Sequence, residues 1–153
     1  PQILQQVRWL GRVLAGRGMP TLLLEDQLEV LVTELSAAIP ENTAAYARLL
    51  PATAALHAAR SQHLTDDQID TLADEFDRAV GPEWRTRLPH TGRLLGAAVA
   101  DELAGCPGAV KSLHAWMSDA DRFPPVWIQA VETALHTARD MAEQTATLDS
   151  AAP

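Results

Sequence analysis

Three aspartates stand close together in the stretch DDQID, at residues 66 to 70. If this stretch is helical, Asp66 and Asp70 lie one turn apart, so both carboxylates can reach one hard cation such as Mg²⁺. Acidic residues also belong in the first turn of a helix, where negative charge interacts favourably with the helix dipole. The stretch therefore predicts the start of a helix, and an enzyme that holds Mg²⁺ with Asp66, Asp67 and Asp70 is an alternative interpretation.

Five histidines are available as ligands, but none stands in a metal-binding pattern. There is no HExxH motif, His57 and His63 are six residues apart, and Cys106 is the single cysteine, so no metal site is predicted. A haem needs only one axial imidazole on a helix. His114 and His90 are the candidate ligands of a haem- or tetrapyrrole-binding protein, which is the alternative from another functional class.

A run of small residues follows His90 in the segment PHTGRLLGAAVADELAGCPG. Gly92, Gly96, Ala100 and Ala104 recur every four residues, on one side of a helix predicted over 91–104. Small residues at this spacing allow another helix or a flat ligand to approach the backbone closely. We predict close packing against the helix over 21–39 or the one over 125–146, in the middle of the bundle, with a ligand slot as the alternative.

Tryptophan outnumbers the other aromatic residues, and two tryptophans flank the loop SDADRFPP. We expect Trp116 and Trp127 to pack beneath this loop, or to line a ligand pocket. A further tryptophan lies in the segment PEWRTRLPHTGR with Arg85, Arg87 and Arg93. These arginines are candidates for binding an anion near the first turn of the 91–104 helix, and a solvated loop is the alternative.

Several functional classes lack their usual sequence signals. The chain has no glycine-rich nucleotide loop and no nucleophile elbow. Its net charge of −8 argues against nucleic acid as the main partner. No apolar run approaches ~18 residues, so no membrane span is predicted. One cysteine excludes an internal disulfide and suits a cytoplasmic location.

Alanine and leucine dominate the composition and favour helices throughout. We predict one all-α domain of six or seven helices in a layered bundle over 1–146, followed by a frayed tail over 147–153, and a globin-like arrangement is an alternative. The broad apolar surface of 21–39 indicates a central helix. Pro51 should break a helix over 41–63 near residue 50. Thr65 and Gln68 match a capping box.

These patterns together predict a non-catalytic sensory or regulatory domain that binds a small ligand or a partner protein. The chain starts at Pro1, which indicates a piece of a longer chain, and a homodimer is compatible with the apolar helix faces. Candidate pocket residues are the aromatic, imidazole and small side chains already described: Trp116, Trp127, His114, His90, Gly92, Gly96 and Ala100.

Overall fold

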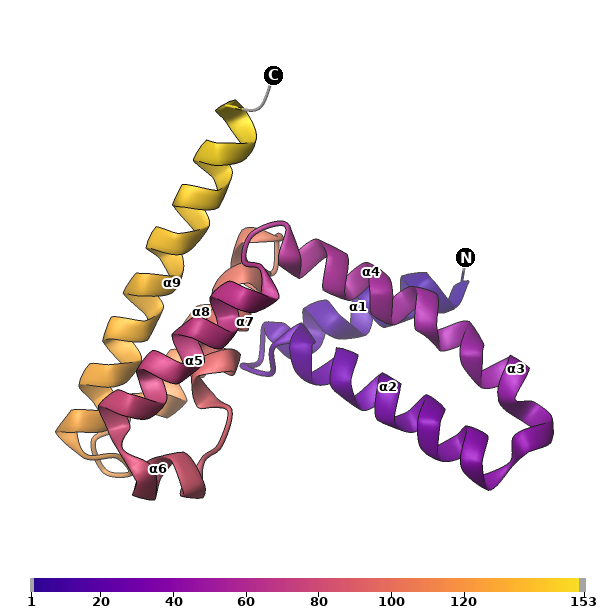
Figure 1. The fold of residues 1–153 in the computed structure, drawn as a ribbon, viewed down its shortest axis with the longest axis horizontal. Helices are drawn as coiled ribbons and strands as arrows, with labels where there is room; N and C mark the ends of the chain where they lie inside the picture. Colours follow the sequence, from indigo (N-terminus) through magenta and orange to yellow (C-terminus); the bar gives the residue numbers. More distant parts are fainter. Residues whose placement is uncertain (1, 152–153) are drawn as a thin grey trace.

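The computed structural model describes residues 2–151, which form helices joined by short turns (Figure 1). No strand occurs in this range, so the prediction of an all-α fold is confirmed. The described residues contain nine α-helices, one of them a single turn, which exceeds the six or seven predicted. The helices are α1 (Gln2–Ala15), α2 (Thr21–Ala38), α3 (Thr43–Tyr46), α4 (Leu50–Ser61), α5 (Asp66–Val80), α6 (Pro82–Arg87), α7 (Thr91–Leu103), α8 (Ala109–Met117) and α9 (Pro125–Ala151), with 3₁₀ turns η1 (Pro40–Asn42) and η2 (Ala47–Leu49).

The additional elements arise where prolines interrupt the helical pattern. The segment 41–63 divides into η1, α3, η2 and α4, and Pro51 lies in the first turn of α4, as the predicted break requires. A proline is tolerated there because the first backbone N–H groups of a helix have no intrahelical partner. Pro82 starts α6 in the same way, within the segment PEWRTRLPHTGR for which a solvated loop was one interpretation.

The start of α5 agrees with the sequence prediction, whereas α9 ends later than predicted. The backbone N–H of Gln68 donates to Thr65 Oγ1 at 3.3 Å, and the N–H of Thr65 donates to Gln68 Oε1 at 2.9 Å, so the predicted capping box is confirmed. Residues 147–151 of the predicted frayed tail continue α9, and 152–153 lie outside the described residues.

The helices gather around two large apolar cores, which define two groups, and a small third cluster joins Ala15 of α1 to Cys106 and Ala109. In the N-terminal group, α1–α4, Val7, Leu24, Leu28, Ala52 and Leu56 pack together. In the C-terminal group, α5–α9, a larger core surrounds the fully buried Trp127. Figure 1 shows α2 and α3 on one side of the molecule and α9 on the other. Helix α7 contacts α5, α8 and α9 and also α2 and α4, so it is the central helix that joins the groups.

The small residues of α7 face a helix, but a different helix from those predicted. A Cβ atom added to Gly92 would lie 2.6 Å from the Cα of Ala73, and one added to Gly96 would lie 3.0 Å from Cδ2 of Leu72. Both neighbours belong to α5. The expected partners, 21–39 and 125–146, were wrong for these two glycines because sequence periodicity identifies a close-packing face without identifying what covers it.

Helix α2 lies at an edge of the molecule, contrary to the expectation of a central helix. Leu23, Val30 and Leu31 are 41%, 54% and 39% exposed, while Leu24 and Leu28 on the other side are buried. The apolar surface of α2 is broader than the area that its neighbours cover. A broad apolar surface in the sequence therefore does not by itself show that a helix is central. No helix in the described range is long and apolar enough to cross a membrane.

Candidate functional site

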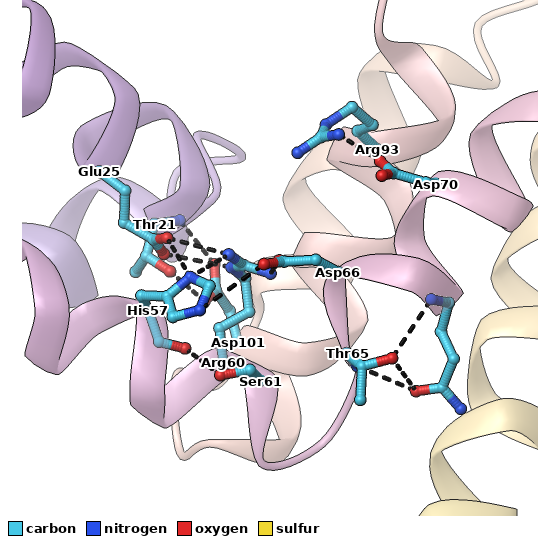
Figure 2. A network of polar contacts seen from close by, with 11 residues as sticks. Thr21, Glu25, His57, Arg60, Ser61, Thr65, Asp66, Asp70, Arg93 and Asp101 are labelled. Atoms are coloured by element: carbon cyan, nitrogen blue, oxygen red, sulfur yellow. Dashed lines mark hydrogen bonds and ion pairs between the residues drawn. The ribbon is translucent and has the colours of Figure 1, made fainter.

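Buried polar groups concentrate where the two helix groups meet. Figure 2 shows side chains from α2 and α4 converging on side chains from α5 and α7. Thr21, Glu25, Arg60 and Asp101 are all less than one-tenth exposed. Buried charges are costly unless they are paired and hydrogen-bonded, so this junction must satisfy its polar groups internally. We describe these four residues, with His57 and Asp66, as the junction network.

Arg60 is the centre of the junction network, and it is 2% exposed. Its Nε and Nη2 donate to the two carboxylate oxygens of Glu25 at 3.2 and 3.0 Å, which is a bidentate pair. Its Nη1 donates to Asp66 at 3.0 Å, and Nη2 also donates to Nδ1 of His57 at 3.0 Å. Burial lowers the pKa of Arg60, but the hydrogen bonds and charges of the two carboxylates outweigh it and raise the pKa overall. Arg60 is therefore a fixed positive charge that links α4 to α2 and α5.

A second link joins α2 to α7 through Asp101. The backbone N–H of Thr21 donates to one carboxylate oxygen at 2.7 Å, and the Thr21 hydroxyl donates to the other at 2.5 Å. Thr21 is the first residue of α2, so the acid caps orphan donors of a helix that is remote in sequence. Burial raises the pKa of Asp101, the hydrogen bonds from Thr21 lower it, and the nearby charge of Glu25 raises it. The net direction is upward.

A cleft opens beside this network, and we call it the junction cleft. Its volume is about 170 Å³. Helix α1 contributes arginines, α4 contributes mostly small apolar residues, and α7 with the turn after it contributes Asp101, Ala104 and Cys106. The cleft thus has one charged side, one apolar side and the junction network against it. The lining residues are Arg8, Arg12, Thr21, Ala55, Leu56, Ala59, Arg60, Asp101, Ala104 and Cys106.

The two arginines of α1 differ from Arg60 in their electrostatic state. Both Arg8 and Arg12 are exposed, and neither forms an ion pair with an acid in the described part of the chain. They lie in a segment, 1–24, that carries no acidic residue. The cleft is therefore bordered by positive charge with hydrogen-bond donors still available.

The cleft is suited to binding rather than to nucleophilic chemistry. Cys106 is buried, and burial raises the pKa of its thiol; the charge of Asp101 raises it further, while Arg12 lowers it. A thiol with a raised pKa is protonated at neutral pH and is a poor nucleophile. The guanidinium of Arg60 is already held by two carboxylates. The groups that remain free to meet a ligand are the donors of Arg8 and Arg12 and the apolar side chains.

Two of the three aspartates in the DDQID stretch form ion pairs with different partners. Asp66 accepts from Arg60, and Asp70 pairs with Arg93 of α7. Asp66 and Asp67 also occupy the first turn of α5, as the helix-start interpretation predicts. Within residues 2–151, no group of three or more His, Cys, Asp or Glu side chains is placed to hold a metal ion. The stretch serves helix capping and interhelical pairing in this structure.

The predicted pocket residues do not meet at one site. Trp127 is fully buried and Phe123 of the SDADRFPP loop stacks on it at 4.9 Å, while Trp116 contacts the same Phe123 edge-on at 5.4 Å. The expected packing beneath the loop is thus seen for Trp127, whereas Trp116 is 45% exposed. His114 pairs with Glu132 of α9 at 2.5 Å, and His90 is an exposed residue with a left-handed backbone (φ 65°) before α7. Ala100, Gly92 and Gly96 are buried within α7.

The three arginines predicted to bind an anion also point to different partners. Arg87 lies over the ring of Trp84 at 4.6 Å and pairs with Glu83 at 3.5 Å. Arg93 pairs with Asp70, and Arg85 lines a different depression that contains Asp74 and Asp77. Although these three arginines are close together in the sequence, they do not form one shared anion-binding site in the structure.

Sequence patterns did not predict the junction cleft, although Ala104 in its lining belongs to the small-residue run for which a ligand slot was the alternative. Arg60 and Glu25 are 35 positions apart, and Thr21 and Asp101 are 80 apart. The one available signal was that residues 1–24 contain arginines and no acid.

Comparison with known proteins gives no match: no family model, no curated protein and no solved structure is similar enough to this chain to assign a relationship.

Proposed function

We propose that this chain is a non-catalytic regulatory domain whose small ligand occupies the junction cleft. The observation that supports it is the position of the cleft, which borders α1, α4 and α7 and has both links of the junction network, Arg60 and Asp101, in its lining. A ligand that contacts both helix groups binds one relative arrangement of them better than another. It shifts the conformational equilibrium by that difference in affinity. Occupancy then becomes a signal that a partner protein can respond to.

The proposal predicts that filling the cleft abolishes ligand binding. Ala58 and Ala59 are neighbouring exposed residues of α4, but only Ala59 lines the cleft. We would screen small carboxylates, phosphates, amines and neutral polyols by thermal shift on the wild-type protein, Ala59→Leu and Ala58→Leu. We expect binders to stabilise the wild type and Ala58→Leu and to lose their effect on Ala59→Leu. Binders that stabilise all three proteins equally would place the ligand elsewhere and contradict the proposal.

The regulatory part of the proposal needs a readout at the junction itself. The backbone N–H of Thr21 donates to Asp101 across the two helix groups, so its hydrogen exchange reports opening of the junction. We expect exchange at Thr21 to slow when a binder is added. The amide of Gly81, which bonds within the C-terminal group to Asp77, provides the control and should change little. Binding with no change at Thr21 would indicate a ligand without a regulatory effect on the junction.

A further inference from the structure

The electrostatic balance of the junction cleft limits the charge of its ligand. Arg60 lines the cleft, but the two carboxylates of Glu25 and Asp66 more than offset its single positive charge. Arg8 and Arg12 contribute two positive charges without partners, and Asp101 contributes one negative charge. The positive charges that border the cleft without an acidic partner are therefore those of Arg8 and Arg12, and they favour a ligand with an anionic group.

The shape and lining of the cleft limit the rest of the ligand. Its volume of about 170 Å³ lies below the 300–1,000 Å³ that is typical of sites for drug-sized molecules. Leu56, Ala55, Ala59 and Ala104 form apolar walls. Such walls favour a short hydrocarbon body over a sugar or a nucleotide, whose hydroxyl groups would lose their bonds to water there.

We propose that the junction cleft binds a small organic monocarboxylate, with the carboxylate held by Arg8 and Arg12 and the apolar body lying against Leu56 and the alanines. Guanidinium groups match carboxylates in geometry and form charge-assisted hydrogen bonds with them. Inorganic phosphate would offer these arginines an anion but has no apolar body to lie against the walls of the cleft. This inference rests on the proposed function and specifies the ligand class for the same site.

Probes with one body and three charges test the ligand class directly. Benzoate, benzyl alcohol and benzylamine share an aromatic ring and present an anion, a neutral hydroxyl and a cation, and inorganic phosphate tests an anion without an apolar body. We would measure their affinities by isothermal titration calorimetry. We expect benzoate to bind, with benzyl alcohol and benzylamine each at least about tenfold weaker, because a hydrogen bond to a charged group contributes about a factor of ten or more. Phosphate should also bind more weakly than benzoate, because it has no apolar body to bury against the walls.

Matched variants identify the arginines that hold the carboxylate. Arg8→Gln and Arg12→Gln remove one positive charge each at exposed positions, so circular dichroism should show an intact fold. We expect each to weaken benzoate about tenfold or more and to leave benzyl alcohol nearly unchanged. Arg48→Gln is the control, because Arg48 is also exposed and does not line the cleft. A loss confined to Arg8→Gln and Arg12→Gln supports the assignment, whereas an equal loss in Arg48→Gln reflects net charge only and overturns it.

The remaining outcomes separate the ligand class from the proposed function. Tighter binding of phosphate, benzyl alcohol or benzylamine than of benzoate, with sensitivity to Ala59→Leu, would retain a cleft ligand and overturn the monocarboxylate. Benzoate binding that survives Ala59→Leu would place the carboxylate outside the cleft and overturn the inference. If none of the four probes and no screened compound binds in a way that Ala59→Leu abolishes, both the ligand class and the proposed function are wrong.

Discussion

The contact between α5 and α7 allows a sharp comparison of Gly92→Ala with Gly96→Ala. The Cβ of an alanine at 92 would lie 2.6 Å from the Cα of Ala73, and that backbone atom cannot rotate away. Helix α5 must move from α7, which loosens the buried residues Ile69 and Phe76. Overpacking of this kind costs about 1–3 kcal/mol. Alanine recovers up to about 1 kcal/mol of helix propensity, and less in the first turn, where residue 92 lies.

The same substitution at position 96 should behave differently. There the nearest atom is Cδ2 of Leu72 at 3.0 Å, the end of a side chain that can change rotamer. We expect Gly92→Ala to lose about 1–2 kcal/mol of unfolding free energy and Gly96→Ala to stay within about 0.5 kcal/mol of wild type. Urea unfolding followed by tryptophan fluorescence measures both, because Trp127 is buried against Phe76. Unchanged m-values would show that the difference lies in stability rather than in the extent of unfolding.

A particular ranking would refute this argument. If Gly92→Ala is as stable as wild type, α5 yields without cost and the close contact does not constrain the bundle. If Gly96→Ala is the more destabilised variant, the distinction between a rigid backbone neighbour and a flexible side chain is wrong. Gly11→Ala provides a reference, because its added Cβ would meet only side-chain atoms, at 3.3 Å or more.

Three further predictions concern the polar contacts. Arg60→Leu should destabilise the protein by about 3–5 kcal/mol in urea unfolding, because it leaves the buried carboxylate of Glu25 without its partner, and Arg60→Leu with Glu25→Leu should recover part of that loss. Thr65→Ala should cost about 1 kcal/mol through loss of the capping box, measured as a lower urea midpoint. Burial holds the pKa of Asp101 above its ordinary value near 3.8, so its contribution to stability is complete below that value and declines as pH rises through the folded-state pKa. The difference in unfolding free energy between wild type and Asp101→Asn should therefore fall as the pH rises from about 3.8 through the folded-state pKa of Asp101. A difference that rises with pH would show that the hydrogen bonds from Thr21 outweigh burial.

Local features of this fold were predictable because they depend on neighbours in the sequence. The capping box at Thr65 and Gln68 needs only residues three positions apart, and Pro51 interrupts a helix through its own missing N–H and ring. The four-residue spacing of Gly92 and Gly96 likewise indicated that α7 must pack closely against a neighbour. Composition alone was sufficient for the all-α class, because alanine and leucine favour helices wherever they lie.

Long-range features were decided by the tertiary structure alone. Periodicity shows that a helix has an apolar face, but which helix covers that face depends on the packing of helices that are distant in the sequence. For this reason sequence patterns did not predict that α5, rather than α2 or α9, lies over Gly92, or that α2 is at the edge of the molecule. The junction network pairs Arg60 with Glu25 and Thr21 with Asp101 across 35 and 80 positions. No spacing rule connects such residues. These pairs form because a charged or polar group that is buried on folding needs a hydrogen-bonding partner nearby, and which groups are nearby is set only when the helices pack together.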